Sequence, residues 1–393
     1  MPPVLPDHFA APEEPVDLLV VVGEHSGDQH AARLIRRLRE ISPALRVSAL
    51  GGEALRESGC QLLFDTTRFS AVGLFEVLRH YGFFRRFFQC TTDWITKHQP
   101  KAVLLVDYPG FNLRLARWMK ESGQSCAGGG RLRCLFYIGP QIWAWKAGRR
   151  FKMAQWLDAL GVIFPFEVSC YADTNLSVSF VGHPFAEADY VSPVTYAPND
   201  TVLLLPGSRP GPVKRIYPVL LAAAQALRSR RPGVRFCTLY PGESIRELLE
   251  EMRIRHAPDL AVEASGGGGI KAAAVLTSSG TMSLHCALSG IPGAIVYRAN
   301  PMTYVLGRLV VKIPYLGMAN LLLQRPAWPE YLQGDAKPER LAAEVEACLD
   351  DADRPVQAAK DARALLALLS PQSGETSVNA HSAARWLQEV MRS

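Results

Sequence analysis

An aspartate that directly follows an apolar run is a candidate for acid–base chemistry in this sequence. Residues 102–106 read Ala-Val-Leu-Leu-Val, which is typical of a strand buried on both faces, and Asp107 comes next. Open α/β sheets bind ligands at the carboxyl ends of their strands. A carboxylate at the edge of an apolar cleft can have its pKa raised toward the range that suits a general base. We therefore predict that Asp107 is a general base; the alternative is an aspartate that only caps the next helix.

Two loops further along the chain have the composition of phosphate-binding turns. The first, Gly-Ser-Arg at 207–209, follows the apolar run 201–205 and offers backbone N–H groups, a hydroxyl and a planar guanidinium. The second, Ser-Ser-Gly-Thr at 278–281, follows the run 272–277 and opens a helix, whose N-terminus attracts anions. Either loop alone could be an ordinary turn with a capping hydroxyl. Together they favour a nucleotide diphosphate as the ligand, and because no Walker A lysine pattern occurs, nucleoside triphosphate hydrolysis is not favoured.

Two further segments suit a ligand site, and each has a structural alternative. The turn 23–28, Gly-Glu-His-Ser-Gly-Asp, contains small residues that would let a ligand approach the backbone. Alternatively, Ser26 or Asp28 only caps a helix. The segment 137–150 contains two tryptophans, a glutamine and three cations, a mixture that suits a sugar with an anionic group. Here the alternative is that the aromatic residues belong to the core and the cations to a solvated face.

Residues 79–88 combine four phenylalanines with three arginines. On a helix they would form an apolar stripe flanked by cations, the pattern by which peripheral proteins bind anionic bilayers. The alternative is a core helix whose arginine side chains extend to solvent. We favour contact with a membrane or with acyl chains, because four clustered phenylalanines exceed what one amphipathic turn needs.

These candidate residues lie on alternating apolar runs and helical patterns that predict an α/β fold class. Continuous apolar strands separated by helices are typical of a parallel sheet covered on both faces. The polar segment 187–200 is expected to link a first unit, 16–186, to a second one, 201–370. We expect two Rossmann-like domains with a cleft between the carboxyl edges of their sheets. The expected strands are 17–22, 102–106, 132–138, 159–164 and 178–181, then 201–205, 234–240, 272–277 and 294–297; the expected helices are 30–40, 213–230, 338–349, 357–369 and 381–392.

The composition limits the classes of protein that fit. The chain has 393 residues, 48% hydrophobic and 20% charged, and a net charge of +6, so it is an ordinary globular protein and only weakly suited to nucleic acid. Its eight cysteines show no metal-ligand spacing, which indicates reduced thiols and a cytoplasmic location. Residues 1–15 lack the regions of a signal peptide and are expected to be a flexible leader. No stretch has the roughly 20 unbroken apolar residues of a transmembrane helix.

Several short motifs occur in order along most of the chain. They are GE-x-SGD at 23–28, GLFEVL at 73–78, DYPGFN at 107–112, PQIWAW at 140–145, IFPFE at 163–167, VGHP at 181–184, LLPGSR at 204–209, SGT at 279–281 and Asn320 within ANLLL. Together they resemble the lipid-A-disaccharide synthase family, over about residues 16–349. The ordered set makes this resemblance far more specific than any single loop.

The resemblance implies an inverting glycosyltransferase of the GT-B fold, cytoplasmic and peripheral to the bacterial inner membrane. Such an enzyme joins UDP-2,3-diacylglucosamine to 2,3-diacylglucosamine 1-phosphate through a β-1,6 bond and releases UDP. For this chain it implies no metal, no other cofactor and no nucleic-acid partner. It also implies a homodimer that exchanges C-terminal segments, so we expect residues 371–393 to return to the N-terminal domain of their own or the partner chain.

The resemblance also assigns roles to single residues. Asp107 is the implied base for the acceptor 6-hydroxyl. The implied nucleotide and diphosphate contacts are Gly207, Ser208, Arg209, Ser279, Gly280, Thr281, His285 and Asn320; the implied acceptor-side residues are Ser26, Asp28, Glu76, Gln141 and Trp143; and the residues expected at the membrane or the acyl chains are Phe83, Phe84, Phe87, Phe88, Arg85 and Arg86.

One position departs from the family pattern. Four residues after Thr281 the family has a glutamate that relatives use on the uridine ribose, and this chain has His285. A neutral imidazole can accept one hydrogen bond but cannot bridge two hydroxyls as a carboxylate does. A degenerate relative that binds lipid or nucleotide without turnover is therefore an alternative. Another is a different GT-B transferase or a UDP-sugar epimerase with a soluble substrate.

Overall fold

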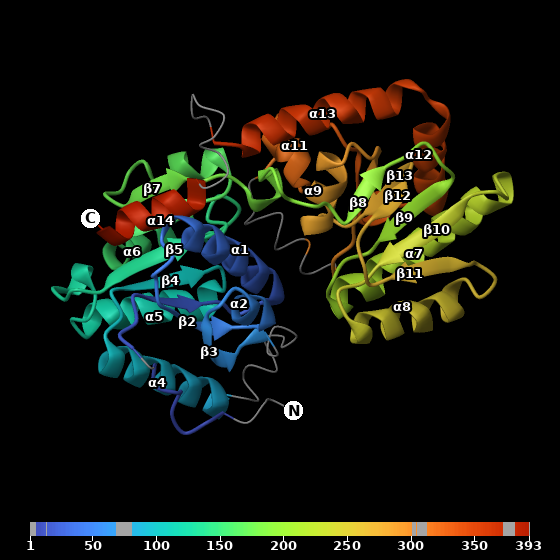
Figure 1. Ribbon diagram of the computed structural model, residues 1–393. Helices are drawn as coiled ribbons and strands as arrows, with labels where there is room; N and C mark the ends of the chain where they lie inside the picture. The colour runs from blue at the N-terminus through green and yellow to red at the C-terminus, as the bar shows by residue number, and fades with distance from the viewer. Residues whose placement is uncertain are drawn as a thin grey trace. The chain divides into compact units, whose positions relative to one another are not determined.

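The computed structural model describes residues 5–12, 14–67, 81–300, 304, 313–371 and 382–392. The chain divides into two compact units (Figure 1). Unit 1 contains residues 1–188 and 369–393, and unit 2 contains residues 189–368. Each is a Rossmann-like α/β unit built on a parallel sheet, which confirms the predicted fold class.

Unit 1 is built on a seven-stranded parallel sheet in the order β3-β2-β1-β4-β5-β6-β7. From β1 the chain adds β2 and β3 on one side of the sheet. It then crosses to β4 on the other side of β1 and continues outward to β7. All residues of β1 and β4 are buried, which is why both strands read as continuous apolar runs. The strands are β1 (Leu18–Val21), β2 (Val47–Gly51), β3 (Gln61–Asp65), β4 (Ala102–Val106), β5 (Arg133–Tyr137), β6 (Ala159–Val162) and β7 (Ser177–Phe180).

The helices of unit 1 pack apolar faces against this sheet. The helix expected at 30–40 is longer than predicted, because α1 (His25–Ile41) begins inside the turn 23–28. Asp28 then lies in the first turn, where the helix dipole favours an acidic side chain. The other helices are α2 (Glu53–Glu57), α4 (Tyr81–His98), α5 (Pro109–Glu121) and α6 (Arg149–Trp156), with short 3-10 helices η2 (Cys126–Gly128), η3 (Pro165–Tyr171) and η4 (Pro184–Ala186).

Unit 2 has a six-stranded parallel sheet in the order β11-β10-β9-β13-β14-β15. Its strands are β9 (Thr201–Leu205), β10 (Arg235–Leu239), β11 (Val262–Ser265), β13 (Ala274–Thr277), β14 (Gly293–Tyr297) and β15 (Glu330–Leu332). Its helices are α7 (Pro210–Arg230), α8 (Glu243–His256), α9 (Thr281–Leu288), α11 (Met318–Leu323), the 3-10 helix η5 (Gln333–Asp335), α12 (Pro338–Asp350) and α13 (Asp353–Leu369).

The segment between the two main sheets differs from the irregular linker expected at 187–200. Residues Val194–Tyr196 form β8, which pairs in parallel with β12 (Ile270–Ala272) in a separate two-stranded sheet. The strand is hard to see in the sequence because only Val194 of its residues is buried. The single strand expected at 272–277 is also corrected, because β12 ends at Ala272 and β13 begins at Ala274 in another sheet.

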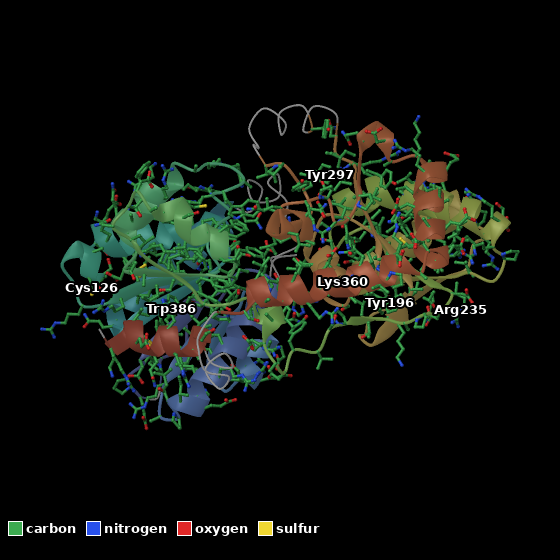
Figure 2. All side chains as sticks on the ribbon, turned by 90° about the horizontal axis from the view of Figure 1, so that it is seen from above. Cys126, Tyr196, Arg235, Tyr297, Lys360 and Trp386 are labelled. Carbon is green, nitrogen blue, oxygen red and sulfur yellow. The ribbon has the colours of Figure 1, made fainter. Side chains whose placement is uncertain are left out.

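The last helix, α14 (Ser382–Arg392), belongs to unit 1 and lies beside α1, as Figure 1 shows in red and blue. Trp386, labelled in Figure 2, packs on Gly161 of β6, where a Cβ would lie 3.0 Å from the indole ring. Gln388 Nε2 donates to the carbonyl oxygen of Ile41 at 3.2 Å and to Ser42 Oγ at 2.6 Å. In this chain the helix therefore covers α1 and β6 of its own unit 1.

Candidate active site

The loop between β4 and α5 carries Asp107 on an unusual backbone. Asp107 and Tyr108 have φ angles of 46° and 47°, in the left-handed region that non-glycine residues rarely adopt. Buried Asn112 holds this loop, because its Nδ2 donates to the carbonyl oxygens of Asp107 at 2.8 Å and Val106 at 3.2 Å. The N–H of Asp107 donates to the carbonyl oxygen of Tyr137 in β5 at 3.1 Å. The half-buried Asp107 is thus fixed at the carboxyl end of β4.

The first turn of the chain packs directly on this loop. A Cβ at Gly23 would lie 2.2 Å from Cγ of Tyr108, so the tyrosine ring fits there only because residue 23 is glycine. The same ring stacks on Phe111 with centroids 5.9 Å apart. Tyr108 is also the N-cap residue of α5, so Asp107 stands one residue outside the capping position. Two motifs distant in the sequence therefore lie side by side at the ends of β1 and β4.

Ser26 and Asp28, both expected on the acceptor side, have different surroundings in the first turn of α1. Ser26 is exposed. Asp28 is only 1% exposed, and its carboxylate accepts the N–H groups of Gly52 at 2.7 Å and Ala54 at 3.0 Å. Burial raises the pKa of Asp28, and these backbone hydrogen bonds lower it in part. Asp28 thus caps the N-terminus of α2 and not that of its own helix. Its side chain has almost no surface left for contact with a ligand.

The loop between β5 and α6, residues 138–148, leaves the same edge of the sheet as Asp107, because β5 is the neighbour of β4. Gln141 is exposed on this loop. Trp143 is half-buried and meets the ring of Phe166 edge-on, with centroids 5.4 Å apart. Trp145, in contrast, is 45% exposed. The interpretation as core residues therefore describes Trp143, which packs into unit 1. The interpretation as a ligand site remains open for Trp145, which faces solvent.

A buried carboxyl group beside this loop was not singled out by the sequence. Glu167 in η3 is 4% exposed, and its Oε2 accepts the N–H of Phe164 at 3.1 Å. Burial raises the pKa of Glu167 to about 7, and the Phe164 N–H and the Trp143 indole oppose this rise. The Trp143 N–H lies near the carboxyl group but outside hydrogen-bond geometry. The only sequence signal was the place of Glu167 in the IFPFE motif after β6.

Residues 81–88 of the phenylalanine-rich segment form the first half of α4, and they differ in how far they are buried. Phe87 is 4% exposed and belongs to the core of unit 1, where it contacts Phe111 with centroids 5.1 Å apart. Arg86 pairs with Asp7, and both side chains are exposed. Phe83, Phe84 and Phe88 are half-buried, Phe83 and Phe88 also pack against this core, and Arg85 is exposed. Glu76, expected on the acceptor side, lies outside the described residues.

The two predicted phosphate loops lie next to each other in unit 2, because β9 and β13 are adjacent strands. The N–H of Ser278 donates to the carbonyl oxygen of Leu205 at 2.8 Å. Gly207 has a φ of 119°, and a Cβ on it would lie 3.3 Å from Ser278 Oγ. Arg209 and Gly280 are the N-cap residues of α7 and α9, so two helix N-termini open at this edge. The exposed residues of the pair are Ser208, Arg209, Gly280 and Thr281, and Ser279 is half-buried.

His285, at the position of the family glutamate, is packed inside unit 2. It is 6% exposed, and its ring stacks on that of Tyr190 with centroids 5.6 Å apart and an interplanar angle of 21°. The Tyr190 hydroxyl lies 3.2 Å from Nδ1 and 3.3 Å from Nε2 of the imidazole. Tyr190 comes from the segment before β8, and no pattern in the sequence pointed to it as a partner of His285.

Asn320 is fully buried and connects α11 to β15. Its Nδ2 donates to the Trp328 carbonyl oxygen at 2.7 Å and to Glu330 Oε1 at 2.9 Å, and its Oδ1 accepts the Trp328 N–H at 2.8 Å. Glu330 in turn accepts the N–H groups of Leu316 and Gly317, each at 2.9 Å. Both amide hydrogens of Asn320 are thus engaged inside unit 2, where they hold the loop before α11.

The described residues contain neither a candidate metal cluster nor a membrane-spanning helix. Within the described ranges, no group of three or more His, Cys, Asp or Glu side chains could hold a metal ion. Among the helices that the structure describes, none is both long and apolar enough to cross a bilayer. The eight cysteines are free thiols.

Comparisons with known proteins agree over most of the chain. The sequence model of the lipid-A-disaccharide synthetase family matches residues 18–384. The lipid-A-disaccharide synthase of Geobacter sulfurreducens is 34% identical over 368 residues, which cover 91% of this chain and 93% of that protein.

Solved structures with low sequence identity share the fold. The UDP-GlcNAc 2-epimerase of Neisseria meningitidis, bound to UDP-GlcNAc, matches with a TM-score of 0.57 and 9% identity over 95% of this chain and 99% of that one. The spinosyn forosaminyltransferase matches with a TM-score of 0.56 and 13% identity over 96% of this chain and 100% of that one. At these identities the likeness shows two Rossmann-like domains and nothing about the substrate.

Proposed function

Because this chain belongs to the lipid-A-disaccharide synthetase family, we propose that it transfers 2,3-diacylglucosamine from UDP to the 6-hydroxyl of 2,3-diacylglucosamine 1-phosphate. Family membership makes it a glycosyltransferase of lipid A disaccharide synthesis. The proposed products are the β-1,6-linked disaccharide and UDP. The observation that carries the proposed chemistry is the position of Asp107, which is half-buried on a clamped loop at the carboxyl end of β4.

In the proposed reaction Asp107 is the general base. Its carboxylate takes the proton of the acceptor 6-hydroxyl while the oxygen forms a bond to the anomeric carbon of the donor. The bond between that carbon and the UDP oxygen breaks on the opposite face, so the configuration inverts and the electron pair leaves with UDP. The hydrogen bonds from Asn112 and to Tyr137 keep the loop of Asp107 in place before the acceptor arrives.

The adjacent loops of unit 2 are the proposed site of the donor diphosphate. Negative charge develops on the departing UDP, and backbone N–H groups at two helix N-termini together with the Arg209 guanidinium would stabilise it. The close approach of Gly207 to Ser278 supports a shared cradle, because the two loops are in contact without a ligand. His285 and Asn320 would act from beneath this surface, since both are buried and hydrogen-bonded within unit 2.

We further propose a peripheral location at the cytoplasmic face of the inner membrane and a homodimer with exchanged C-terminal segments. The half-buried Phe83, Phe84 and Phe88 and the exposed Arg85 on α4 support contact with acyl chains and anionic headgroups. Phe87 is excluded from that surface because it belongs to the core. In such an exchange a partner's α14 would take the place that the chain's own α14 has against α1 and β6 in this structure.

The test of this function is incubation of the purified chain with both lipid substrates in detergent. We expect equal amounts of UDP and β-1,6-linked disaccharide, and no disaccharide with an acceptor that lacks the 6-hydroxyl. UDP-sugar binding without any disaccharide would establish the alternative of a degenerate relative, for which His285 is the motivating residue. Epimerised UDP-sugar as the product would establish the other alternative; the family comparison favours neither.

A further inference from the structure

Two cations gather on one exposed tryptophan in the loop between β5 and α6. Lys146 Nζ lies 4.2 Å from the centroid of the Trp145 ring, and the Arg149 guanidinium carbon lies 5.4 Å from it. Trp145 is 45% exposed, Lys146 is exposed, and Arg149 is half-buried. An aromatic face attracts cations, and here it brings two of them to one place.

Within the described residues, these two cations carry no neutralising carboxylate. Across the parts of the chain that the structure describes, neither Lys146 nor Arg149 has an Asp or Glu oxygen within 4.0 Å. The neighbouring Arg150 differs, because its Nη2 lies 2.5 Å from Asp173 and its guanidinium lies 4.2 Å from the ring centroid of Phe151. Two like charges held close together repel each other unless an anion binds between them, so the cluster suits a ligand with more than one negative charge.

The backbone of the loop fixes the position of this cluster. Lys146 has a φ of 56°, a left-handed conformation that non-glycine residues adopt mainly where the surroundings impose it, as at ligand sites. The N–H of Arg149 donates to the Lys146 carbonyl oxygen at 2.9 Å, and Arg149 is the first residue of α6. The cations therefore precede or open a helix of eight residues, whose N-terminus adds to the positive potential.

The loop also begins where the proposed acceptor would lie. It leaves β5 at Tyr137, whose carbonyl oxygen accepts the N–H of Asp107 at 3.1 Å. Trp145, Lys146 and Arg149 thus belong to the segment that follows β5, the strand whose last residue accepts the N–H of Asp107.

We propose that Lys146 and Arg149, supported by Trp145, bind the phosphate monoester of the acceptor. This inference rests on the proposed function, because the acceptor is then a sugar 1-phosphate. The guanidinium donates to two phosphate oxygens, the ammonium group neutralises the second charge, and the indole covers an apolar part of the lipid. Lys146 and Arg149 are positioning residues for this substrate, and neither takes part in proton transfer.

The test compares the double variant Lys146→Ala/Arg149→Ala with Arg150→Ala as the matched control. Rates are measured in detergent with the diacylglucosamine acceptor carrying or lacking its 1-phosphate. We expect the double variant to raise the KM for the phosphorylated acceptor roughly tenfold to a hundredfold, since charge-assisted hydrogen bonds are lost. The kcat, the KM for the donor and the rate with the unphosphorylated acceptor should stay near wild type, as should all values for Arg150→Ala. An unchanged acceptor KM, or an equal loss with both acceptors, would overturn the proposal.

Two further measurements separate this site from the proposed function and from the bilayer. Titration of glucosamine 1-phosphate followed by ³¹P NMR needs no turnover. If the wild type binds this sugar phosphate and the double variant does not, the site stands even when no disaccharide forms. Sedimentation with phosphatidylglycerol vesicles tests the other source of phosphate. Loss of vesicle binding by the double variant, together with an unchanged acceptor KM in detergent, would assign the cluster to the membrane surface and overturn the acceptor site.

Discussion

The loop at Asp107 in unit 1 and the paired loops of unit 2 present different chemical groups and are held in place in different ways. At Asp107 a carboxylate is offered on two consecutive left-handed residues, held by the buried amide of Asn112 and by the ring of Tyr108 on Gly23. In unit 2 a glycine with φ of 119° and two helix N-termini present mainly backbone N–H groups.

The difference follows from what each site has to do. A base must place one atom accurately, so the chain accepts backbone strain and surrounds the loop with fixed side chains. A diphosphate offers many oxygens, so a ring of backbone donors suffices. Unit 1 should therefore be sensitive to the chemistry of side chains, and unit 2 to the freedom of its backbone.

Asp107→Asn should produce the largest effect, because it removes the proposed base and keeps the size of the side chain. We expect kcat to fall by a factor of about 10² to 10⁴, the range of general-base catalysis. The binding of UDP by unit 2 should be unchanged, as should the midpoint of urea unfolding. Calorimetric titration with UDP measures the first, and circular dichroism the second. Full activity in the variant would show that the loop at Asp107 is structural only.

A pH titration should separate Glu167 from the exposed acids. Its folded-state pKa of about 7 lies above the ordinary 4.5, because the carboxyl group is buried. The folded chain therefore holds this proton more tightly than the unfolded chain, so the stabilising contribution is full below pH 4.5 and is lost as the pH rises through 7. Glu167→Gln should remove this loss, which is on the order of 2–3 kcal/mol between pH 5 and pH 8. Glu57→Gln, at an exposed position, is the control. Parallel pH dependence of the wild type and Glu167→Gln would contradict the buried acid.

Gly23→Ala tests whether the first turn and the Asp107 loop depend on each other. The added methyl group would meet the Tyr108 ring at 2.2 Å, and overpacking of this kind destabilises by about 1–3 kcal/mol. Tyr108→Ala removes the ring. Adding Gly23→Ala to Tyr108→Ala should therefore lower the free energy of unfolding much less than adding it to the wild type. The measurement is a double-mutant cycle from urea unfolding. Additive effects would mean that the two motifs are adjacent without coupling.

Gly207→Ala should have the smallest effect on stability, about 1 kcal/mol, because alanine is strained at φ of 119°. Its main consequence is expected at the donor, where KM should rise several-fold while the acceptor KM stays constant. Gly233→Ala is the matched control in unit 2, since its φ lies outside the left-handed region and nothing lies within 4 Å of the added methyl group. If Gly207→Ala raised the acceptor KM instead, the division of labour between the units would be wrong.

The sequence predicted the strand ends well, because buried parallel strands are continuous apolar runs and the turns after them are short. This reasoning placed Asp107 and both loops of unit 2 after strand ends, as the structure has them. The role of Asp28 was left open, since a buried aspartate that accepts two N–H groups looks the same in sequence as an exposed one. The stacking of Tyr190 on His285 joins residues 95 positions apart and has no local signal. Strand β8 was missed because one buried valine carries too little periodicity.

The position of α14 determines the order in which the two units can be completed. Unit 2 lies between the two parts of unit 1 along the chain, so every residue of 189–368 is synthesised before α14. Until then β6 and α1 expose the surface that Trp386 and Gln388 later cover. Unit 2 can thus fold completely while the chain is still being synthesised, whereas unit 1 keeps this surface exposed until α14 is made. During that interval the α14 helix of another chain could bind to the exposed surface of β6 and α1 first.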